Sequence, residues 1–294
     1  MSGDDPTTLR GEELVFSYPT GDGPVVDGES ITAEAGAVTA LVGPNGSGKS
    51  TLLEGLADQL PSDSGSVLLD GRAVQSYDEK ELARTMGLLS QESTAPDSIS
   101  VEELVFHGRY PHRGFFEGTT TEDERAVDRA IELAGCGQIR DREVGSLSGG
   151  QRQLAWIAMV LAQDTDVLLL DEPTTFLDLH HQLEVIEIVE TLREESDVTV
   201  VVVLHDIEQA ARLADKVVAL DDGVVRARGQ PDAVVTEELL AEVFQVDATV
   251  ESTPRGPRIE PLRARHAGDE TADRGHSGGE RDRLDEPATH TGGD

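Results

Sequence analysis

Residues 43–51, with the sequence GPNGSGKST, match the pattern G-x-x-x-x-G-K-[ST] of loops that hold nucleotide phosphates. Glycines let backbone N–H groups turn inward onto phosphate oxygens, and the positive end of a following helix adds to the attraction. Lys49 is placed to reach the β- and γ-phosphates, and the Ser50 hydroxyl to ligate Mg²⁺, which prefers oxygen ligands. The candidate nucleotide-binding residues here are Gly43, Pro44, Asn45, Gly46, Ser47, Gly48, Lys49, Ser50 and Thr51.

Two adjacent acids, Asp171 and Glu172, end the apolar run VLLLDEP. A carboxylate at the end of a buried strand can hold Mg²⁺ through water, which is the role we expect for Asp171. Glu172 lies one residue further toward the site, where a carboxylate can polarise the attacking water as a general base. The pair could instead form a solvated turn, but the apolar run before it and Pro173 after it favour the catalytic interpretation.

His205 and Gln91 also follow short apolar runs, in VVVLH and MGLLSQ. The carboxyl ends of strands line the ligand crevice in parallel α/β sheets, so the His205 imidazole could hydrogen-bond the γ-phosphate. On position alone a single histidine could equally be structural, and Gln91 alone indicates nothing. The residue pattern therefore leaves both roles open.

A second stretch suited to phosphate lies at residues 147–151, with the sequence LSGGQ. It offers the Ser148 hydroxyl, two glycines and the Gln151 amide at the start of an expected helix. One apolar face of that helix is predicted by residues at i, i+3, i+4 and i+7: Leu154, Ile157, Ala158 and Leu161. The chain thus carries two phosphate sites where one nucleotide needs only one.

The elements that must position these residues are predicted to form an α/β core with a parallel sheet. The runs at 167–170 and 198–204 are continuous and β-rich, as is typical of strands buried on both faces. A helix is expected from about residue 50 to residue 60. The remaining expected strands and hairpins lie at residues 14–20, 31–43, 65–74, 86–91 and 217–225.

The composition becomes more polar from residue 92 to residue 145, with helical patterns at 101–107 and 121–134. Together with the helix after LSGGQ, this region is predicted to form an inserted helical subdomain at 92–163. The last residues, 266–294, contain one large apolar side chain, Leu284, and cannot bury enough surface to offset chain entropy. We therefore predict a disordered acidic tail there.

The chain of 294 residues is strongly acidic, with a formal net charge of −34. Its basic residues are nearly all arginine, because Lys49, Lys80 and Lys216 are the only lysines. Such a surface repels nucleic acid, so no nucleic-acid partner is expected. A folded, acidic, lysine-poor protein suits a halophilic host, because charge screening to about 3 Å at 1 M salt makes self-repulsion tolerable.

Targeting and redox signals are few. The single cysteine, Cys136, allows no intrachain disulfide. No apolar run approaches the length of a membrane span, and the first ten residues lack the basic and apolar regions of a signal peptide. We expect a cytosolic protein that acts at a membrane only through other chains.

Taken in order, the phosphate loop, Gln91, LSGGQ, LLLDEP, FLD and His205 resemble the nucleotide-binding subunits of ABC transporters over residues 10–260. The resemblance implies a P-loop ATPase core with a mixed central sheet and an N-terminal antiparallel β subdomain. It also implies a head-to-tail dimer, in which LSGGQ of one copy closes on the γ-phosphate held by the other. Each ATP is then shared between two chains, which explains the second phosphate site. The residues that would meet the partner's ATP are Ser148, Gly149, Gly150 and Gln151.

Other roles follow from the same resemblance. Tyr18 matches the aromatic residue that stacks on adenine, and Asp178 matches the aspartate that crosses the dimer interface. Gln91 matches the glutamine that touches Mg²⁺ and the attacking water, and His205 the switch histidine. No member of the hydrolytic set is missing, so an active ATPase using ATP and Mg²⁺ is expected.

Two local sequences narrow the transporter type. HGRYPHRGFF at 107–116 and DEPTTFLDLHHQLEV at 171–185 resemble ATPase subunits for ferric siderophores, haem and cobalamin. The resemblance favours an iron(III)-siderophore importer, with cobalamin or haem as alternatives and a stand-alone exporter subunit as a more distant one. The implied partners are integral-membrane permease subunits and, indirectly, a substrate-binding protein, with this chain at the cytoplasmic face of the membrane.

Two rival ATPase classes fit the sequence poorly. A DNA-repair ATPase of the same superfamily would place a long coiled coil between its two phosphate stretches, which here lie only about a hundred residues apart. A translation-associated ATPase usually carries two cassettes and a basic linker, whereas this chain has one cassette and is acidic.

The expected organisation is an N-terminal extension at 1–9, an ABC ATPase domain at 10–265 and the tail at 266–294.

Overall fold

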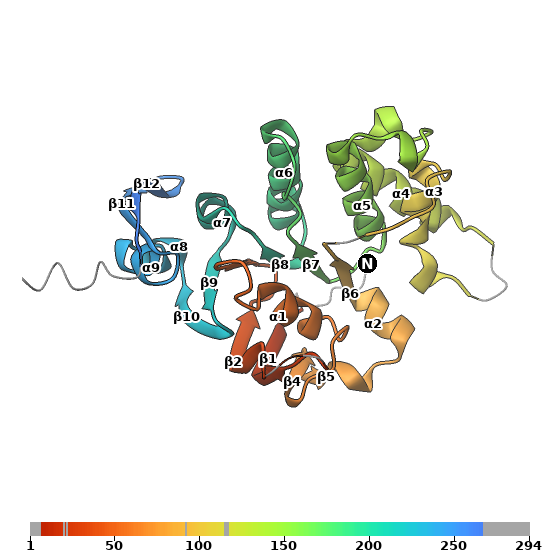
Figure 1. Ribbon diagram of the computed structural model, residues 1–294. Coiled ribbons are helices and arrows are strands. Elements are labelled where there is room, and N and C mark those ends of the chain that lie inside the picture. The colour runs from red at the N-terminus through yellow and green to blue at the C-terminus, as the bar shows by residue number, and fades with distance from the viewer. Residues whose placement is uncertain (1–6, 20, 22, 92, 115–117, 267–294) are drawn as a thin grey trace, which may run out of the picture.

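A six-stranded sheet forms the centre of the computed structural model, which describes residues 7–19, 21, 23–91, 93–114 and 118–266 (Figure 1). The strands lie in the order β10-β9-β3-β8-β7-β6, and all are parallel except β10, which pairs with β9 in an antiparallel hairpin. The prediction of a mixed central sheet is confirmed. The strand bounds are β3 Val38–Val42, β6 Met86–Leu89, β7 Val167–Asp171, β8 Thr199–Val203, β9 Lys216–Asp221 and β10 Val224–Gly229.

Three interior strands, β3, β8 and β7, are buried along their whole length. This confirms that the continuous valine and leucine runs are central parallel strands. Asp171 at the end of β7 pairs with Val203 at the end of β8. The carboxyl ends of parallel strands meet at one edge of a sheet, so the loops after β3, β7 and β8 open side by side.

A second sheet of four antiparallel strands packs beside the first, in the order β2-β1-β4-β5. Its members are β1 Leu9–Phe16, β2 Val26–Ala33, β4 Ser64–Leu69 and β5 Arg72–Ala73. Asp70 and Gly71 both have positive φ, which the tight turn of the expected Asp-Gly hairpin requires. The N-terminal antiparallel β subdomain is therefore confirmed.

Packed residues also lie on the N-terminal side of the expected domain boundary after residue 9. Leu9 is 1% exposed and already belongs to β1, and Thr7 is buried, with its carbonyl accepting a hydrogen bond from Thr199 Oγ1. The packed domain therefore begins at residue 7 at the latest. Residues 1–6 lie outside the described part of the chain.

The helix after the phosphate loop, α1 Lys49–Leu56, packs between the two sheets and ends earlier than the expected residue 60. Asp58 takes a left-handed conformation, and Pro61 disfavours a helical conformation at the residue before it. A further short helix, α2 Glu79–Thr85, leads into β6.

Between β6 and β7 the chain forms the predicted helical subdomain, apart from residues 92 and 115–117, which the structure does not describe. A capping box at Ser100, Thr120 or Ser148 begins each of its three α-helices. The elements are α3 Val101–His107, η2 Tyr110–His112, α4 Thr121–Leu133, η3 Cys136–Ile139, η4 Val144–Ser146 and α5 Gly149–Ala162.

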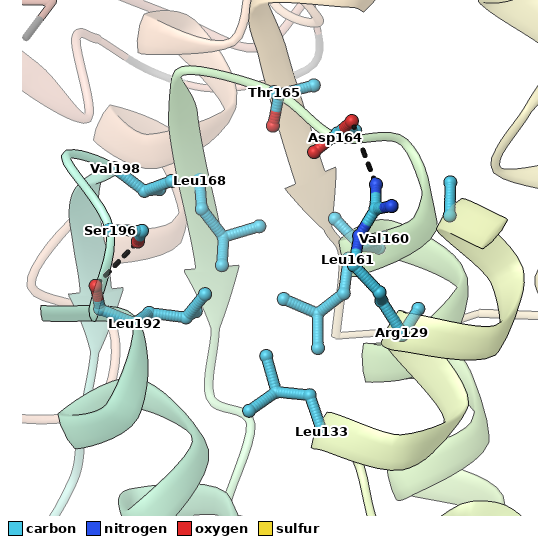
Figure 2. Close-up of a pocket in the computed structure, with 12 residues that line it drawn as sticks. Arg129, Leu133, Val160, Leu161, Asp164, Thr165, Leu168, Leu192, Ser196 and Val198 are labelled. Carbon is cyan, nitrogen blue, oxygen red and sulfur yellow. Dashed lines mark hydrogen bonds and ion pairs between the residues drawn. The ribbon is translucent and has the colours of Figure 1, made fainter. Parts of the chain in front are cut away.

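The helical subdomain meets the core at an apolar seam. Leu133 and Leu161 face Leu168 and Leu192 across a cavity of about 190 Å³ (Figure 2). Buried residues of both parts also join in one hydrophobic cluster, so the cavity is a local gap in a shared core.

The C-terminal third adds elements that the sequence analysis did not anticipate. Two helices of the core are α6 Leu179–Glu195 and α7 Ile207–Leu213. They are followed by α8 Pro231–Val234, α9 Glu237–Glu242 and a separate hairpin of β11 Val246–Thr253 and β12 Gly256–Ala264. The predicted tail lies beyond the described residues except for His266. Within the described ranges, no helix is both long and apolar enough to cross a membrane.

Candidate nucleotide-binding site

A cleft of about 670 Å³ opens at the carboxyl edge of the central sheet. The phosphate loop forms one of its walls, and Val25 just before β2 and the loops after β6, β7 and β8 form the others. The structure thus brings together residues from five separate segments of the sequence. The lining residues are Val25, Asn45, Gly46, Gly48, Lys49, Ser50, Thr51, Gln91, Glu172, Thr175, Phe176 and His205.

The phosphate loop has the backbone that its glycines predict. Gly46 and Gly48 have φ of 81° and 97°. At Gly43 a Cβ would lie 2.1 Å from the Leu220 carbonyl oxygen, so a side chain cannot fit there. The Ser47 hydroxyl is buried and has no hydrogen-bond partner among the described residues, and no side chain there caps α1. The loop backbone and the Ser47 hydroxyl therefore offer hydrogen-bond donors to an anion at the start of α1.

Lys49 lies across this loop with a relative exposure of 5%. Its ammonium donates to the carbonyl oxygens of Gly43 and Pro44, at 3.0 and 2.9 Å. Burial lowers the pKa of Lys49, while the nearby carboxylates of Glu172 and Asp171 oppose that shift. The cation is therefore held against carbonyl dipoles, where a phosphate oxygen could replace them.

Ser50 and Asp171 form the candidate metal position. The Ser50 hydroxyl donates to Asp171 Oδ1 at 3.0 Å. Burial raises the pKa of Asp171 to about 6, with a smaller rise from Glu172 and an opposing effect of the Ser50 hydrogen bond. A buried carboxylate beside a hydroxyl is a donor set that fits Mg²⁺, a hard cation that prefers oxygen.

Three side chains converge on the Glu172 carboxylate. His205 Nε2 lies 2.6 Å from Oε1, and Gln91 Nε2 donates to Oε2 at 2.9 Å. Thr175 Oγ1 also donates to Oε2, at 3.2 Å. Glu172 has a φ of 49°, a left-handed conformation that turns its side chain into the cleft just after β7 ends. The three predicted catalytic residues are therefore in direct contact.

Tyr18 lies beside α1 and is not among the described lining residues of the cleft. Its ring is 40% exposed, and its hydroxyl is 3.2 Å from both Thr51 Oγ1 and Glu54 Oε2. An exposed aromatic next to the phosphate loop is placed to accept a base, but its role in adenine stacking stays a prediction.

The LSGGQ residues lie away from the cleft of their own chain. Ser148 caps α5: its hydroxyl accepts from the Gln151 N–H and its own N–H donates to Gln151 Oε1, both at 3.3 Å. Asp178 caps α6, and its side chain is 68% exposed. Neither these residues nor Gly149 and Gly150 are among the described lining of the cleft.

Three lining residues, Val25, Thr175 and Phe176, were missed by the sequence analysis. Thr175 and Phe176 follow Glu172 in the turn between β7 and α6, and their proximity to that acid was the available signal; Val25 carried none. Phe176 is 99% exposed and has a φ of 61°. A fully exposed aromatic in a left-handed conformation at the mouth of a cleft indicates a surface that another molecule covers.

A phosphate loop, an acid pair at the adjacent strand end and a separate LSGGQ helix on this mixed α/β fold define an ATP-hydrolysing transport cassette. A family model described as ABC transporter matches residues 26–175. The chain belongs to the ABC transporter family, as one of its ATP-binding subunits.

Among curated relatives, the ferric enterobactin transport ATP-binding protein FepC of Escherichia coli (strain K12) is 46% identical over 86% of this chain and 94% of its own length. The iron(3+)-hydroxamate import ATP-binding protein FhuC of Bacillus subtilis (strain 168) is 42% identical over 84% of this chain and 91% of its own.

Two solved structures have the same fold. A transporter assigned to the metal-chelate type, in an inward-facing conformation, has a TM-score of 0.74 at 28% identity, over 87% of this chain and 98% of that one. The dimeric bacterial ABC transporter cassette MJ0796 has a TM-score of 0.67 at 25% identity, over 76% and 98%.

Proposed function

We propose that this chain hydrolyses ATP to power import of an iron(III)-siderophore through a separate membrane permease, at the cytoplasmic face of the membrane. The convergence of Gln91, His205 and Thr175 on Glu172 beside the phosphate loop is the observation that supports hydrolysis. The cargo rests on the relatives, whose names specify ferric enterobactin and iron(3+)-hydroxamate. Cobalamin or haem import is the alternative, and a stand-alone exporter subunit a more distant one.

The working unit in this proposal is a head-to-tail dimer. The LSGGQ stretch and Asp178 are not among the described lining residues of the cleft of their own chain, and a second copy would bring them to the γ-phosphate. Phe176 at the cleft mouth and Leu179 beside it, 99% and 70% exposed, form an apolar surface for that copy to cover. The likeness to a cassette that is dimeric supports a dimer here.

Each residue of the cleft then has a defined task. The loop N–H groups and Lys49 bind the phosphates, and Glu172 accepts a proton from the attacking water. Mg²⁺, when bound, would neutralise phosphate charge, and Ser50, Asp171 and the Gln91 side-chain oxygen would hold it. His205 would orient Glu172 and the γ-phosphate, while Tyr18 would stack on adenine.

The Glu172→Gln variant tests this proposal. An amide cannot take the proton, so turnover should fall about 100-fold or more, while the similar shape preserves ATP binding. We expect ATP and Mg²⁺ to hold the variant as a dimer, measured by light scattering at high salt. Glu194→Gln changes an acid that is 72% exposed and does not line the described cleft, and it should leave turnover unchanged. Turnover near wild type in Glu172→Gln would reject the base assignment, and a monomer with saturating nucleotide would reject the shared site.

The cargo needs a separate experiment. The complex of this chain with its permease, reconstituted in vesicles with the substrate-binding protein, should hydrolyse ATP faster when a ferric siderophore is supplied. Cobalamin and haem serve as parallel additions. If cobalamin or haem stimulates ATP hydrolysis and the ferric chelate does not, that compound replaces the proposed cargo. Export of the cargo from the vesicles would reverse the proposed direction of transport.

A further inference from the structure

Helix α6 lies between α5 and α7, and two adjacent side chains near its start contact both neighbours (Figure 1). These side chains are His181 and Gln182. Neither lines the described part of the nucleotide cleft, and the function proposed above gives neither of them a task.

His181 packs directly on Gly150 of the LSGGQ stretch. A Cβ added at Gly150 would lie 2.3 to 2.6 Å from three atoms of the imidazole ring. Real Cβ atoms do not come this close, so the ring fills the space that any larger residue at 150 would need. The His181 side chain is 19% exposed, because the start of α5 covers it.

The same imidazole fixes Asp178. His181 Nδ1 is 2.9 Å from Asp178 Oδ1, and the His181 backbone N–H donates to that oxygen at 3.1 Å. These hydrogen bonds, the backbone one first, hold the pKa of Asp178 below its usual value. One residue therefore sets the position of both LSGGQ and Asp178 within a single chain.

Gln182 extends the connection to α7. Its amide donates to the Leu177 carbonyl oxygen at 3.1 Å, and its Oε1 accepts from Gln209 Nε2 at 3.2 Å. The Gln209 backbone N–H in turn donates to Asp206 Oδ1 at 3.0 Å. Asp206 directly follows His205, whose imidazole contacts Glu172.

We propose that His181 is a positioning residue that holds Gly150 and Asp178 as one unit, and that Gln182 couples this unit to the helix that follows His205. The inference rests on the shared-site dimer proposed above. In that dimer Gly150 and Asp178 serve the ATP of the partner, whereas His205 and Glu172 serve the ATP of their own chain. The contacts of α6 therefore connect, within each chain, the residues that serve one ATP to the residues that serve the other. Packed side chains that have discrete alternative arrangements can carry such coupling between sites.

The His181→Ala variant of the full chain tests the link, with His180→Ala as its matched control. His180 is adjacent in sequence, its side chain is 78% exposed, and it contacts Glu184 at 3.7 Å. We expect His181→Ala to lower kcat about 10- to 100-fold, because misplaced groups lose near-attack geometry. The Hill coefficient for ATP should fall from about two toward one. ATP affinity of the single chain and Tm should stay close to those of His180→Ala.

His181→Asn keeps a polar atom near the position of Nδ1 and should recover part of kcat through Asp178. Equal behaviour of His181→Ala and His180→Ala would overturn the proposal. A parallel loss of Tm, ATP affinity and kcat would also overturn it, since that is the result of a purely structural role. Glu172→Gln tests the dimer separately. If that variant stays monomeric with ATP, whether residue 181 is His or Ala, the shared-site proposal itself has failed.

A stability cycle tests the contact without any dimer. Gly150→Ala should lower Tm by about 5 °C because its methyl overlaps the imidazole ring. In the His181→Gly background the same change should lower Tm by less than half as much, since the ring is gone. Equal losses in the two backgrounds would show that His181 does not constrain residue 150, and the proposal would fail.

Discussion

At the residue scale, Glu172 accepts two side-chain hydrogen bonds and lies 2.6 Å from His205 Nε2. A carboxylate offers about four lone-pair positions, so these partners occupy most of its capacity. One position remains, where the proposed general base could accept the attacking water without losing Gln91, Thr175 or His205. These contacts therefore orient the carboxylate and leave room for the water.

Asp171 yields a stability prediction at the same scale. Its pKa of about 6 lies above the ordinary value of 3.8, so the folded chain favours the neutral carboxyl. The contribution of Asp171 to folding stability is therefore greatest at low pH and is lost as pH rises through about 6. In EDTA at about pH 7.5, Asp171→Asn should raise the free energy of unfolding by about 1 to 3 kcal/mol.

Denaturant unfolding at several pH values measures this gain, which should shrink steadily as pH falls from about 7 to 5. Mg²⁺-dependent turnover should be lost in the same variant. Asp164→Asn is the control, because that side chain is 60% exposed and should change stability little at any pH. A gain for Asp171→Asn that did not depend on pH would rule out burial of the charge as its cause.

Sequence patterns predicted the cleft residues that come from regular positions, such as the loop glycines and the acid at the end of β7. They could not predict which side chains contact Glu172, because Thr175 lies in a turn whose path depends on the left-handed conformations of Glu172 and Phe176. The contact of His181 with Gly150 was also beyond reach. It depends on how two helices pack, which no local pattern encodes.

At the element scale, strands of valine and leucine and helices with capping boxes were predictable, since each carries its own signal. The end of α1 and the hairpin β11–β12 were not. The hairpin has long runs of polar and exposed residues, and it is held by local pairing and by contacts with α7 and α9. Such an element depends on tertiary context more than on its own hydrophobic pattern.

Helix α4 supplies the aspartate of two arginine–aspartate pairs that differ in burial, which gives a matched test of the helical subdomain. Asp123 and Arg109 are 4% and 3% exposed, and Arg109 Nε donates to Asp123 Oδ1 at 3.0 Å. Asp123→Ala leaves a buried arginine without its partner and also removes a cap, so it should cost about 3 to 5 kcal/mol. Asp128 pairs with Arg140 at 2.7 Å but is 57% exposed, and Asp128→Ala should cost about 1 kcal/mol or less.

Alkylation of Cys136 measures the loss of stability of the helical subdomain that Asp123→Ala should cause. Burial raises the pKa of its thiol to about 12, so in the folded chain it should resist alkylation at about pH 8. Asp123→Ala should speed labelling of Cys136 many-fold below the melting temperature, while Asp128→Ala should not. Equal labelling rates in the two variants would show that the Arg109–Asp123 pair does not hold the subdomain closed.

At the scale of the whole molecule, the net charge of −34 opposes both folding and dimer formation. The screening length falls from about 10 Å at 0.1 M salt to about 3 Å at 1 M, so repulsion between like charges should be strong in dilute buffer and weak at high salt. Two copies meeting head to tail would bring two negatively charged surfaces together at the cleft. The acids Asp171 and Glu172 of each site would add to the repulsion there.

The Glu172→Gln dimer should therefore depend on salt. With saturating ATP and Mg²⁺, light scattering should show monomers at about 0.1 M KCl and dimers at about 1 M KCl. Circular dichroism and ATP binding at each concentration separate lost association from lost folding, and a neutral osmolyte of equal osmolality controls for water activity. The Tm should rise over the same range of KCl. Equal dimer formation at both concentrations would mean that ATP and the apolar contacts of Phe176 outweigh the repulsion, and the halophilic interpretation of this surface would lose its support.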